Sequence, residues 1–73
     1  MKRYSVENVK GIIKKWFRYR GFGFIEPEEG DEDVFCHESE IKYEVDPLEG
    51  QKVQFTVVPH LKGPRAENVR LMN

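Results

Sequence analysis

The stretch RGFGFIE, residues 20–26, places two phenylalanines two positions apart with a glycine between them. Successive side chains of a β-strand point to opposite faces, so Phe22 and Phe24 share one face. The other face carries Gly23 and Ile25. The phenylalanine face also carries the two charged ends of the stretch, which makes it a poor core face. We therefore expect the glycine face to line the core, with Ile25 as its anchor, and both rings to lie outside.

The size and composition of the chain limit what it can be. Its 73 residues suffice for one small domain, which buries only roughly 60% of the surface that its unfolded chain exposes. A single cysteine excludes an intramolecular disulfide and favours a reducing compartment, so we expect a cytoplasmic protein. Because no apolar run is long enough to cross a bilayer, we expect no contact with a membrane.

Short segments rich in β-branched and aromatic residues alternate with turn signals made of glycine, proline and acidic residues. We predict strands at residues 9–18, 20–26, 33–38, 51–59 and 65–72, with at most one helical turn in 39–45. Five short strands in a chain of this length predict an all-β fold, a small five-stranded antiparallel β-barrel, because closure removes exposed sheet edges. Ahead of the domain at 9–73, residues 1–8 are expected to be a short basic tail.

Alternation along these strands separates an apolar inner face from a mixed outer face. The predicted inner residues are Ile13, Ile25, Val34, Cys36, Val53, Phe55, Val57, Val69 and Leu71, with Ile41 and Leu48 as plugs. This set forms a sufficient small core without the remaining aromatic residues, which must then serve another purpose.

The remaining aromatic residues fall on the outer faces of the first three predicted strands. They are Trp16 in the first strand, Phe22 and Phe24 in the second, and Phe35 and His37 in the third. Consecutive strands of a meander lie side by side, so these residues predict one exposed aromatic surface rimmed by lysine and arginine. Such a surface suits unpaired nucleic acid, since bases stack on rings and cations contact phosphates.

The net charge of −1 conceals an uneven distribution. Residues 1–20 hold seven Lys/Arg and one acid, a net +6, whereas residues 26–49 hold eleven acids and one lysine, a net −10. Residues 50–73 hold four Lys/Arg and one acid, a net +3. A near-neutral total therefore accommodates both a basic and an acidic region, and the fold decides where they lie.

Four motifs together resemble the cold-shock domain family, over Lys10 to Arg70. They are GFGFI (21–25), DVFCH (33–37), LEGQKVQF (48–55) and KGPRAENV (62–69). The resemblance implies an OB-type barrel that binds single-stranded RNA and DNA with little sequence preference and acts as an RNA chaperone. It also implies a protein without enzymatic activity, cofactor, metal or small-molecule substrate, and we expect a monomer.

The candidate site residues follow from the alternation and from this resemblance. The predicted stacking residues are Trp16, Phe22, Phe24, Phe35 and His37, of which all but Trp16 fall on the family's stacking positions. The predicted phosphate contacts are Lys10, Lys14, Lys15, Arg18, Arg20, Lys62 and Arg65. Two further rings, Tyr19 and Tyr43, are candidates for extra stacking.

The chain departs from the family pattern on the first strand and beyond the third. Where the family reads Lys-Trp-Phe-Asn, a gapless alignment puts Lys15 at the tryptophan and Trp16 at the phenylalanine. A one-residue bulge would instead restore the tryptophan register. We favour the gapless alignment, in which alternation directs Trp16 outward. Glu38 stands where many members carry an aromatic residue, and its carboxylate should weaken phosphate binding nearby.

Competing interpretations are weaker. RGFGFIE also resembles a motif of RNA-recognition domains, but those require two helices and the reverse motif order. Cys36 and His37 are adjacent on a strand and point to opposite faces, so they cannot form a nucleophilic pair. Together with His60 they lack the spacing of a metal site. One alternative stays open: a protein-interaction barrel of the translation machinery that uses the same aromatic face, favoured by the acidic middle third.

Overall fold

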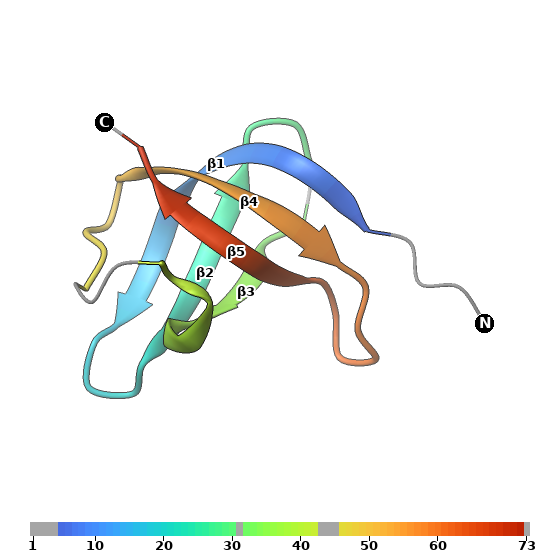
Figure 1. Ribbon diagram of the computed structural model, residues 1–73. Coiled ribbons are helices and arrows are strands. Elements are labelled where there is room, and N and C mark those ends of the chain that lie inside the picture. Colours follow the sequence, from blue (N-terminus) through green and yellow to red (C-terminus); the bar gives the residue numbers. More distant parts are fainter. Residues whose placement is uncertain (1–4, 31, 43–45, 73) are drawn as a thin grey trace.

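The computed structural model describes residues 5–30, 32–42 and 46–72, which form a closed barrel (Figure 1). Its strands are β1 (Val6–Phe17), β2 (Phe22–Pro27), β3 (Val34–His37), β4 (Lys52–Val58) and β5 (Arg65–Leu71), and one 3₁₀ turn, η1, spans Glu38–Glu40. The strand order around the barrel is β1-β2-β3-β5-β4. The predicted five-stranded all-β barrel is confirmed.

Strand β1 organises the barrel because it pairs with two neighbours in succession. Its first half pairs with β4 and its second half with β2, and Figure 1 shows the strand curving across the barrel between them. Four of the five neighbouring pairs are antiparallel. The closing pair, β3 with β5, is parallel and meets at Phe35 and Arg65, because an odd ring of strands cannot alternate direction all the way round.

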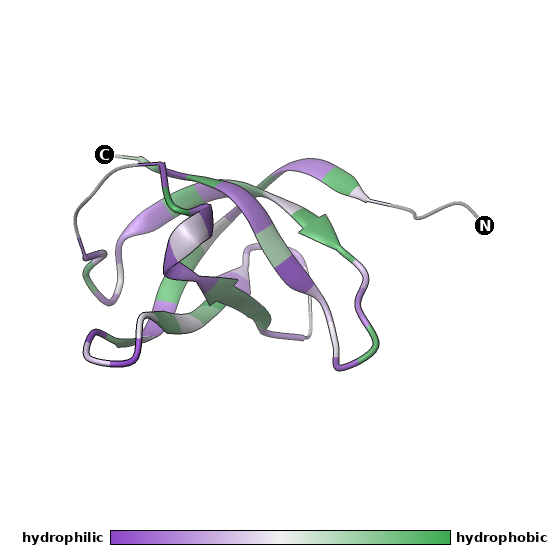
Figure 2. Ribbon diagram, turned by 60° about the horizontal axis from the view of Figure 1, so that its bottom comes forward, coloured by the Kyte–Doolittle hydropathy of each residue, from purple (hydrophilic) through white to green (hydrophobic). Residues whose placement is uncertain are grey.

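The core lies inside the barrel, and the alternating hydropathy of the strands in Figure 2 reflects it. Seven predicted core residues are buried, namely Ile13, Ile25, Val34, Cys36, Val53, Phe55 and Val69. Val58 and Ala66, which were not predicted, are buried as well. Leu71 and Ile41 are only half-buried and pack against this cluster. The glycine face of β2 is thus the core face, as expected, since Ile25 is fully buried.

One core prediction needs correction. Leu48 is 73% exposed rather than a plug, and Pro47 beside it is buried instead, in a loop where the Gln51 amide donates to the Leu48 carbonyl. Val57 is half-buried, packs against the core cluster and pairs with buried Ala66, so it lies on the inner face as predicted. The register shift between Gln54 and Thr56 in the pairing of β4 with β5 places the extra residue on β5, between Glu67 and Arg70, so the alternation along β4 is uninterrupted.

The N-terminal boundary also differs from the sequence-based expectation. Strand β1 begins at Val6, inside the segment expected to be a tail, and Val6 pairs with Val57. Alternation does not reveal this extension because the register shifts between Val6 and Val9. At the shift, Asn8 adopts a left-handed φ of 59° and its side-chain oxygen accepts a hydrogen bond from Gln54 Nε2 at 3.1 Å. Residues 1–4 lie outside the described residues.

Candidate functional site

Strands β2 and β3 place three phenylalanines on the outer face of the barrel. Phe22 and Phe24 alternate with buried Gly23 and Ile25, and all three rings, including Phe35, are half-buried. In the antiparallel register, Phe24 lies directly opposite Phe35, so their side chains share one face. Pairing between the strands therefore brings together rings that are eleven residues apart in the sequence.

A fourth ring, Phe17 of β1, completes this surface, which we call the phenylalanine cluster (Phe17, Phe22, Phe24 and Phe35). Ring centroids of Phe17 and Phe22 lie 5.2 Å apart, and those of Phe22 and Phe35 lie 5.6 Å apart with planes inclined by 30°. Phe24 packs edge-on against Phe22 at 6.3 Å and against Phe35 at 6.0 Å. These are favourable aromatic geometries, so the rings hold one another in place before any ligand arrives.

The register of β1 corrects the predicted orientation of Trp16. Ile13 pairs with Ile25, but the next pairs are Lys15 with Phe24 and Trp16 with Gly23, so one extra residue bulges between Ile13 and Lys15. The bulge reverses the phase of the strand. Trp16 therefore lies on the inner side of the sheet, half-buried against the core, and the prediction that it points outward is wrong.

Two acidic side chains hold Trp16 in this position. Its indole Nε1 donates to Asp46 Oδ1 at 3.2 Å, and its backbone amide donates to Glu49 Oε2 at 3.1 Å. The ring covers Gly23, where the β-carbon of any larger residue would lie 2.5 Å from Trp16 Cε3. Trp16 thus closes an end of the core and belongs to the packing of the barrel rather than to the exposed cluster.

Phe17 is the functional candidate that strict alternation misses. Alternation groups it with inward Ile13, yet it is 41% exposed and lies opposite Phe22 in the register. The same bulge turns Lys15 outward beside Phe24. The sequence offers only an indirect signal for the outward positions of Phe17 and Lys15. Gly23 leaves space on the inner face, and Trp16 fills that space only if β1 contains a bulge.

His37 lies on β3 directly opposite Phe22 and is exposed. Its Nδ1 accepts a hydrogen bond from the backbone amide of Ser39 at 3.1 Å and so caps η1. The Ser39 hydroxyl lies 2.9 Å from the same nitrogen. The imidazole is therefore oriented beside the phenylalanine cluster, with its other nitrogen, Nε2, free of this cap.

The predicted phosphate contacts fall into two groups. Lys14 Nζ pairs with Asp33 Oδ2 at 3.1 Å, and Arg18 Nε lies 3.7 Å from Asp46 Oδ2. The hydrogen bond and charge of Asp33 raise the pKa of the Lys14 ammonium. A phosphate must displace these carboxylates to reach either cation, which reduces the expected gain from both contacts.

The other basic residues have no ion-pair partner within the described part of the chain. Lys15 faces Phe24 across the sheet, Arg20 is exposed in the β1–β2 turn, and Lys62 and Arg65 line a hollow beside the cluster. Lys10 lies in the half of β1 that pairs with β4, opposite Gln54, and so stands apart from the cluster. These placements leave four cations available near the rings.

The remaining candidates lie at the margins. Tyr19 is 95% exposed at the β1–β2 turn, with the Arg18 guanidinium 5.7 Å from its ring centroid. Tyr43 falls outside the described residues. The Glu38 carboxylate packs against Gly21, whose φ of 71° suits a residue without a side chain, and the Glu38 amide donates to the Gly21 carbonyl at 2.9 Å. Glu38 thus places a negative charge at one end of the cluster.

Cys36 is sealed inside the barrel and cannot meet His37, which faces solvent. Burial first, and the charge of Glu40 second, raise the pKa of its thiol from 9.0 to about 12. At neutral pH the sulfur is therefore a protonated thiol that donates weakly to the His37 carbonyl. Among the residues that the structure describes, no three His, Cys, Asp or Glu side chains gather as a metal site would need.

The dependence of the unfolding free energy on alkaline pH tests the burial of Cys36. Because the folded pKa of Cys36 is raised, the neutral thiol stabilises the folded state fully below pH 9, and this contribution is lost as pH rises toward 12. Between pH 8 and 10.5, we expect wild type to lose about 1–2 kcal/mol more unfolding free energy than Cys36→Ala does. Urea titrations at each pH measure the difference, and parallel pH profiles would contradict it.

Comparisons with known proteins identify the family of this chain. A family model described as the 'Cold-shock' DNA-binding domain matches residues 9–72. The chain belongs to the cold-shock domain family. The cold shock-like protein of Aquifex aeolicus is 43% identical over 65 residues, covering 86% of this chain and 93% of that protein. The cold shock-like protein CspE of Escherichia coli K12 is 42% identical over 66 residues, covering 88% and 96%.

The fold of this cold-shock domain is also found in a larger protein. The Drosophila Unr CSD456 structure superposes with a TM-score of 0.78 at 22% identity, covering 93% of this chain and 28% of that one. At this identity the likeness shows the fold alone, which is that of a cold-shock domain barrel. The family's description is that of a DNA-binding domain. In the described residues, no helix is long and apolar enough to span a membrane.

Proposed function

We propose that this cold-shock domain binds single-stranded RNA or DNA by stacking bases on the phenylalanine cluster, with low sequence specificity. One observation supports the proposal most: four phenylalanine rings lie in mutual contact on the outer face of β1, β2 and β3, where a core residue would not be placed. Base–aromatic stacking contributes roughly 1–3 kcal/mol per base and tolerates any sequence, since every base has an aromatic face.

The arrangement of the rings favours binding in a second way. Because Phe22 contacts three other rings, its side chain has little rotational freedom left to lose when a base stacks on it. Ordering a mobile side chain at an interface costs about 0.5–1.5 kcal/mol, so a surface that is already ordered avoids much of this cost.

Stacking on unpaired bases leads to the chaperone activity that we propose. A protein that binds the open form of an RNA hairpin but not its paired form shifts the equilibrium toward the open form. The shift is limited by the difference in affinity, so only weak helices would melt. This step needs no catalytic group, and we propose a monomeric, non-enzymatic protein acting in the cytoplasm.

A salt titration tests the proposal. With three to five phosphate contacts, the logarithm of the affinity for a fluorescein-labelled oligothymidylate should fall with the logarithm of salt concentration, with a slope of about −2 to −4. Fluorescence anisotropy measures the affinity, and a duplex of the same length is the control. Equal affinity for the duplex, or no binding of the single strand at low salt, would rule out the proposal.

The alternative of a protein-interaction barrel keeps one supporting observation. The carboxylates of Asp33 and Asp46 neutralise Lys14 and Arg18 next to the cluster, which lowers the attraction for phosphate. An apolar patch with partly neutralised cations would also suit a peptide. The same titration separates the two candidates, since a peptide-binding barrel would leave the labelled oligothymidylate free at low salt.

A further inference from the structure

A hollow of about 500 Å³ adjoins the phenylalanine cluster on the side of the β4–β5 loop. Its lining, which we call the donor pocket, consists of Phe24, Phe35, His37, His60, Lys62, Gly63 and Arg65. Two rings of the cluster form its apolar part, and the other side chains supply its polar part. Gly63 at the loop tip has a φ of 118°, which turns the loop so that its flanking side chains border the hollow.

Arg65 continues the row of rings into this pocket. Its Cζ atom lies 5.4 Å from the centroid of Phe35, the residue opposite it where β3 and β5 meet. Phe35 in turn stacks on Phe22. The guanidinium group thus lies over the Phe35 ring, next to the space in which a base would enter the pocket. Arg65 has no carboxylate partner in the described part of the chain, so its fork of N–H donors is available.

The two histidines of the pocket share one hydrogen-bond arrangement. The amide of Ser39 donates to His37 Nδ1 at 3.1 Å, and the amide of Lys62 makes a longer contact with His60 Nδ1 at 3.5 Å. A backbone amide can only donate, so each Nδ1 is an acceptor and each neutral ring carries its proton on Nε2. Both free Nε2 atoms are thus hydrogen-bond donors.

The polar side chains of the pocket consequently donate and do not accept. Lys62 and Arg65 have no acceptor atoms, the two histidines offer Nε2–H, and no acidic residue lines the hollow within the described residues. Two nearby loop carbonyls already accept hydrogen bonds: His60 from the Gly63 amide at 3.0 Å, and Pro64 from the Phe35 amide at 3.1 Å. The lining side chains therefore pair with acceptors on a ligand edge, whereas an amino group would have to turn to a loop carbonyl or to the Glu32 carboxylate, whose Oε2 lies 3.9 Å from a β-carbon built at Gly63.

We propose that the donor pocket selects a guanine at one position of the bound strand, an inference that rests on the proposed function. Guanine presents two adjacent acceptors, O6 and N7, which an arginine fork contacts in a bidentate manner. Adenine and cytosine present an amino donor at the corresponding edge. The apolar floor of Phe24 and Phe35 suits the flat face of a base and contributes nothing to a bare phosphate. A local guanine preference would then stand on a background of nonspecific stacking.

A guanine scan tests this inference. We expect wild type to bind one member of a set of nonathymidylates, each carrying a single guanine, about 5- to 10-fold more tightly than the all-thymine strand. Replacing that guanine with 7-deazaguanine, which lacks the N7 acceptor, should abolish most of the preference. Arg65→Lys keeps the charge but not the fork, and should reduce the preference, taken as the ratio of its affinities for the two strands, to less than about 2-fold.

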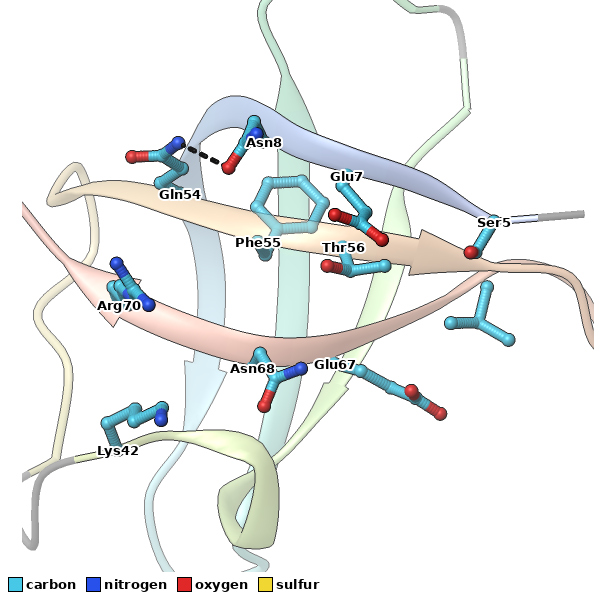
Figure 3. Close-up of a pocket in the computed structure, with 11 residues that line it drawn as sticks. Ser5, Glu7, Asn8, Lys42, Gln54, Phe55, Thr56, Glu67, Asn68 and Arg70 are labelled. Atoms are coloured by element: carbon cyan, nitrogen blue, oxygen red, sulfur yellow. Dashed lines mark hydrogen bonds between the residues drawn. The ribbon is translucent and has the colours of Figure 1, made fainter.

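Arg70→Ala is the matched control. It removes an arginine from the same strand, but Arg70 lies in a separate hollow with Gln54, Asn68 and Lys42, as Figure 3 shows. The control should retain the full guanine preference. If all oligonucleotides of the guanine scan bind tightly and with equal affinity, the guanine inference is wrong and the proposed function stands. An Arg65→Ala variant that weakens every strand equally and lowers the salt slope by about one would assign Arg65 to a phosphate and also overturn it. Loss of binding to every strand would overturn the proposed function itself.

Discussion

Replacing Phe22 and Phe35 together with alanine is expected to weaken binding of an oligothymidylate by about 100-fold or more. Each ring provides a stacking face worth roughly 1–3 kcal/mol, and these two stack on each other at the centre of the cluster. Their loss also removes the contacts that hold Phe17 and Phe24 in place. Anisotropy titrations at one fixed salt concentration measure the change, because the affinity depends on salt.

The control for this experiment removes exposed apolar side chains elsewhere. Leu48 and Leu61 are both strongly exposed and lie in loops, so Leu48→Ala with Leu61→Ala should leave the affinity within about 2-fold of wild type. Both double variants should unfold cooperatively, since neither changes a fully buried core residue. Binding that survives the loss of Phe22 and Phe35 in a folded protein would show that the phenylalanine cluster is not the binding surface.

Gly23→Ala is expected to destabilise the barrel by about 2–3 kcal/mol, which lowers the melting temperature by roughly 10–20 °C in a domain of this size. A β-carbon at this position would overlap the carbonyl oxygen of Lys15 and press against Trp16. The carbonyl belongs to the backbone of the paired strand, so it cannot move aside without distorting the sheet. Thermal unfolding followed by Trp16 fluorescence measures the loss, since the indole packs directly on Gly23.

Gly30→Ala provides the matched comparison. The nearest atoms to a β-carbon there belong to Pro27, at 3.4 and 3.6 Å, which is an ordinary contact. This variant should change the melting temperature by no more than a few degrees. A Gly23→Ala protein as stable as Gly30→Ala would mean that Trp16 does not cover Gly23, and the inward register of β1 would be wrong.

Strands β2 and β3 are the part of the site that local sequence could predict. Alternation of ring and glycine, followed by the apolar Val34 and Cys36, assigns both faces without ambiguity, and no bulge interrupts these strands. Strand β1 could not be predicted in the same way. Its bulge lies between Ile13 and Lys15, and a single inserted residue exchanges the two faces for every residue after it.

The electrostatics of the site also needed the tertiary structure. Lys14 and Asp33 are nineteen residues apart, and Arg18 and Asp46 are joined only because the loop before β4 returns to the start of β2. The acidic middle third therefore reaches into the basic rim, which a count of charges along the chain does not show. His60 and Arg65 enter the donor pocket for the same reason, through the closure of β5 on β3.

Sequence alone determined the all-β class, most of the core and the outward Phe22 and Phe24, because each depends on periodicity within one short strand. Tertiary structure decided that Trp16 turns inward and Phe17 outward, and that two carboxylates neutralise part of the basic rim. These outcomes depend on pairing register and on contacts between segments distant in the chain. The periodicity of one strand contains no information about where that strand bulges. The position of the bulge depends on how side chains pack against the partner strand, and here Trp16 packs on Gly23.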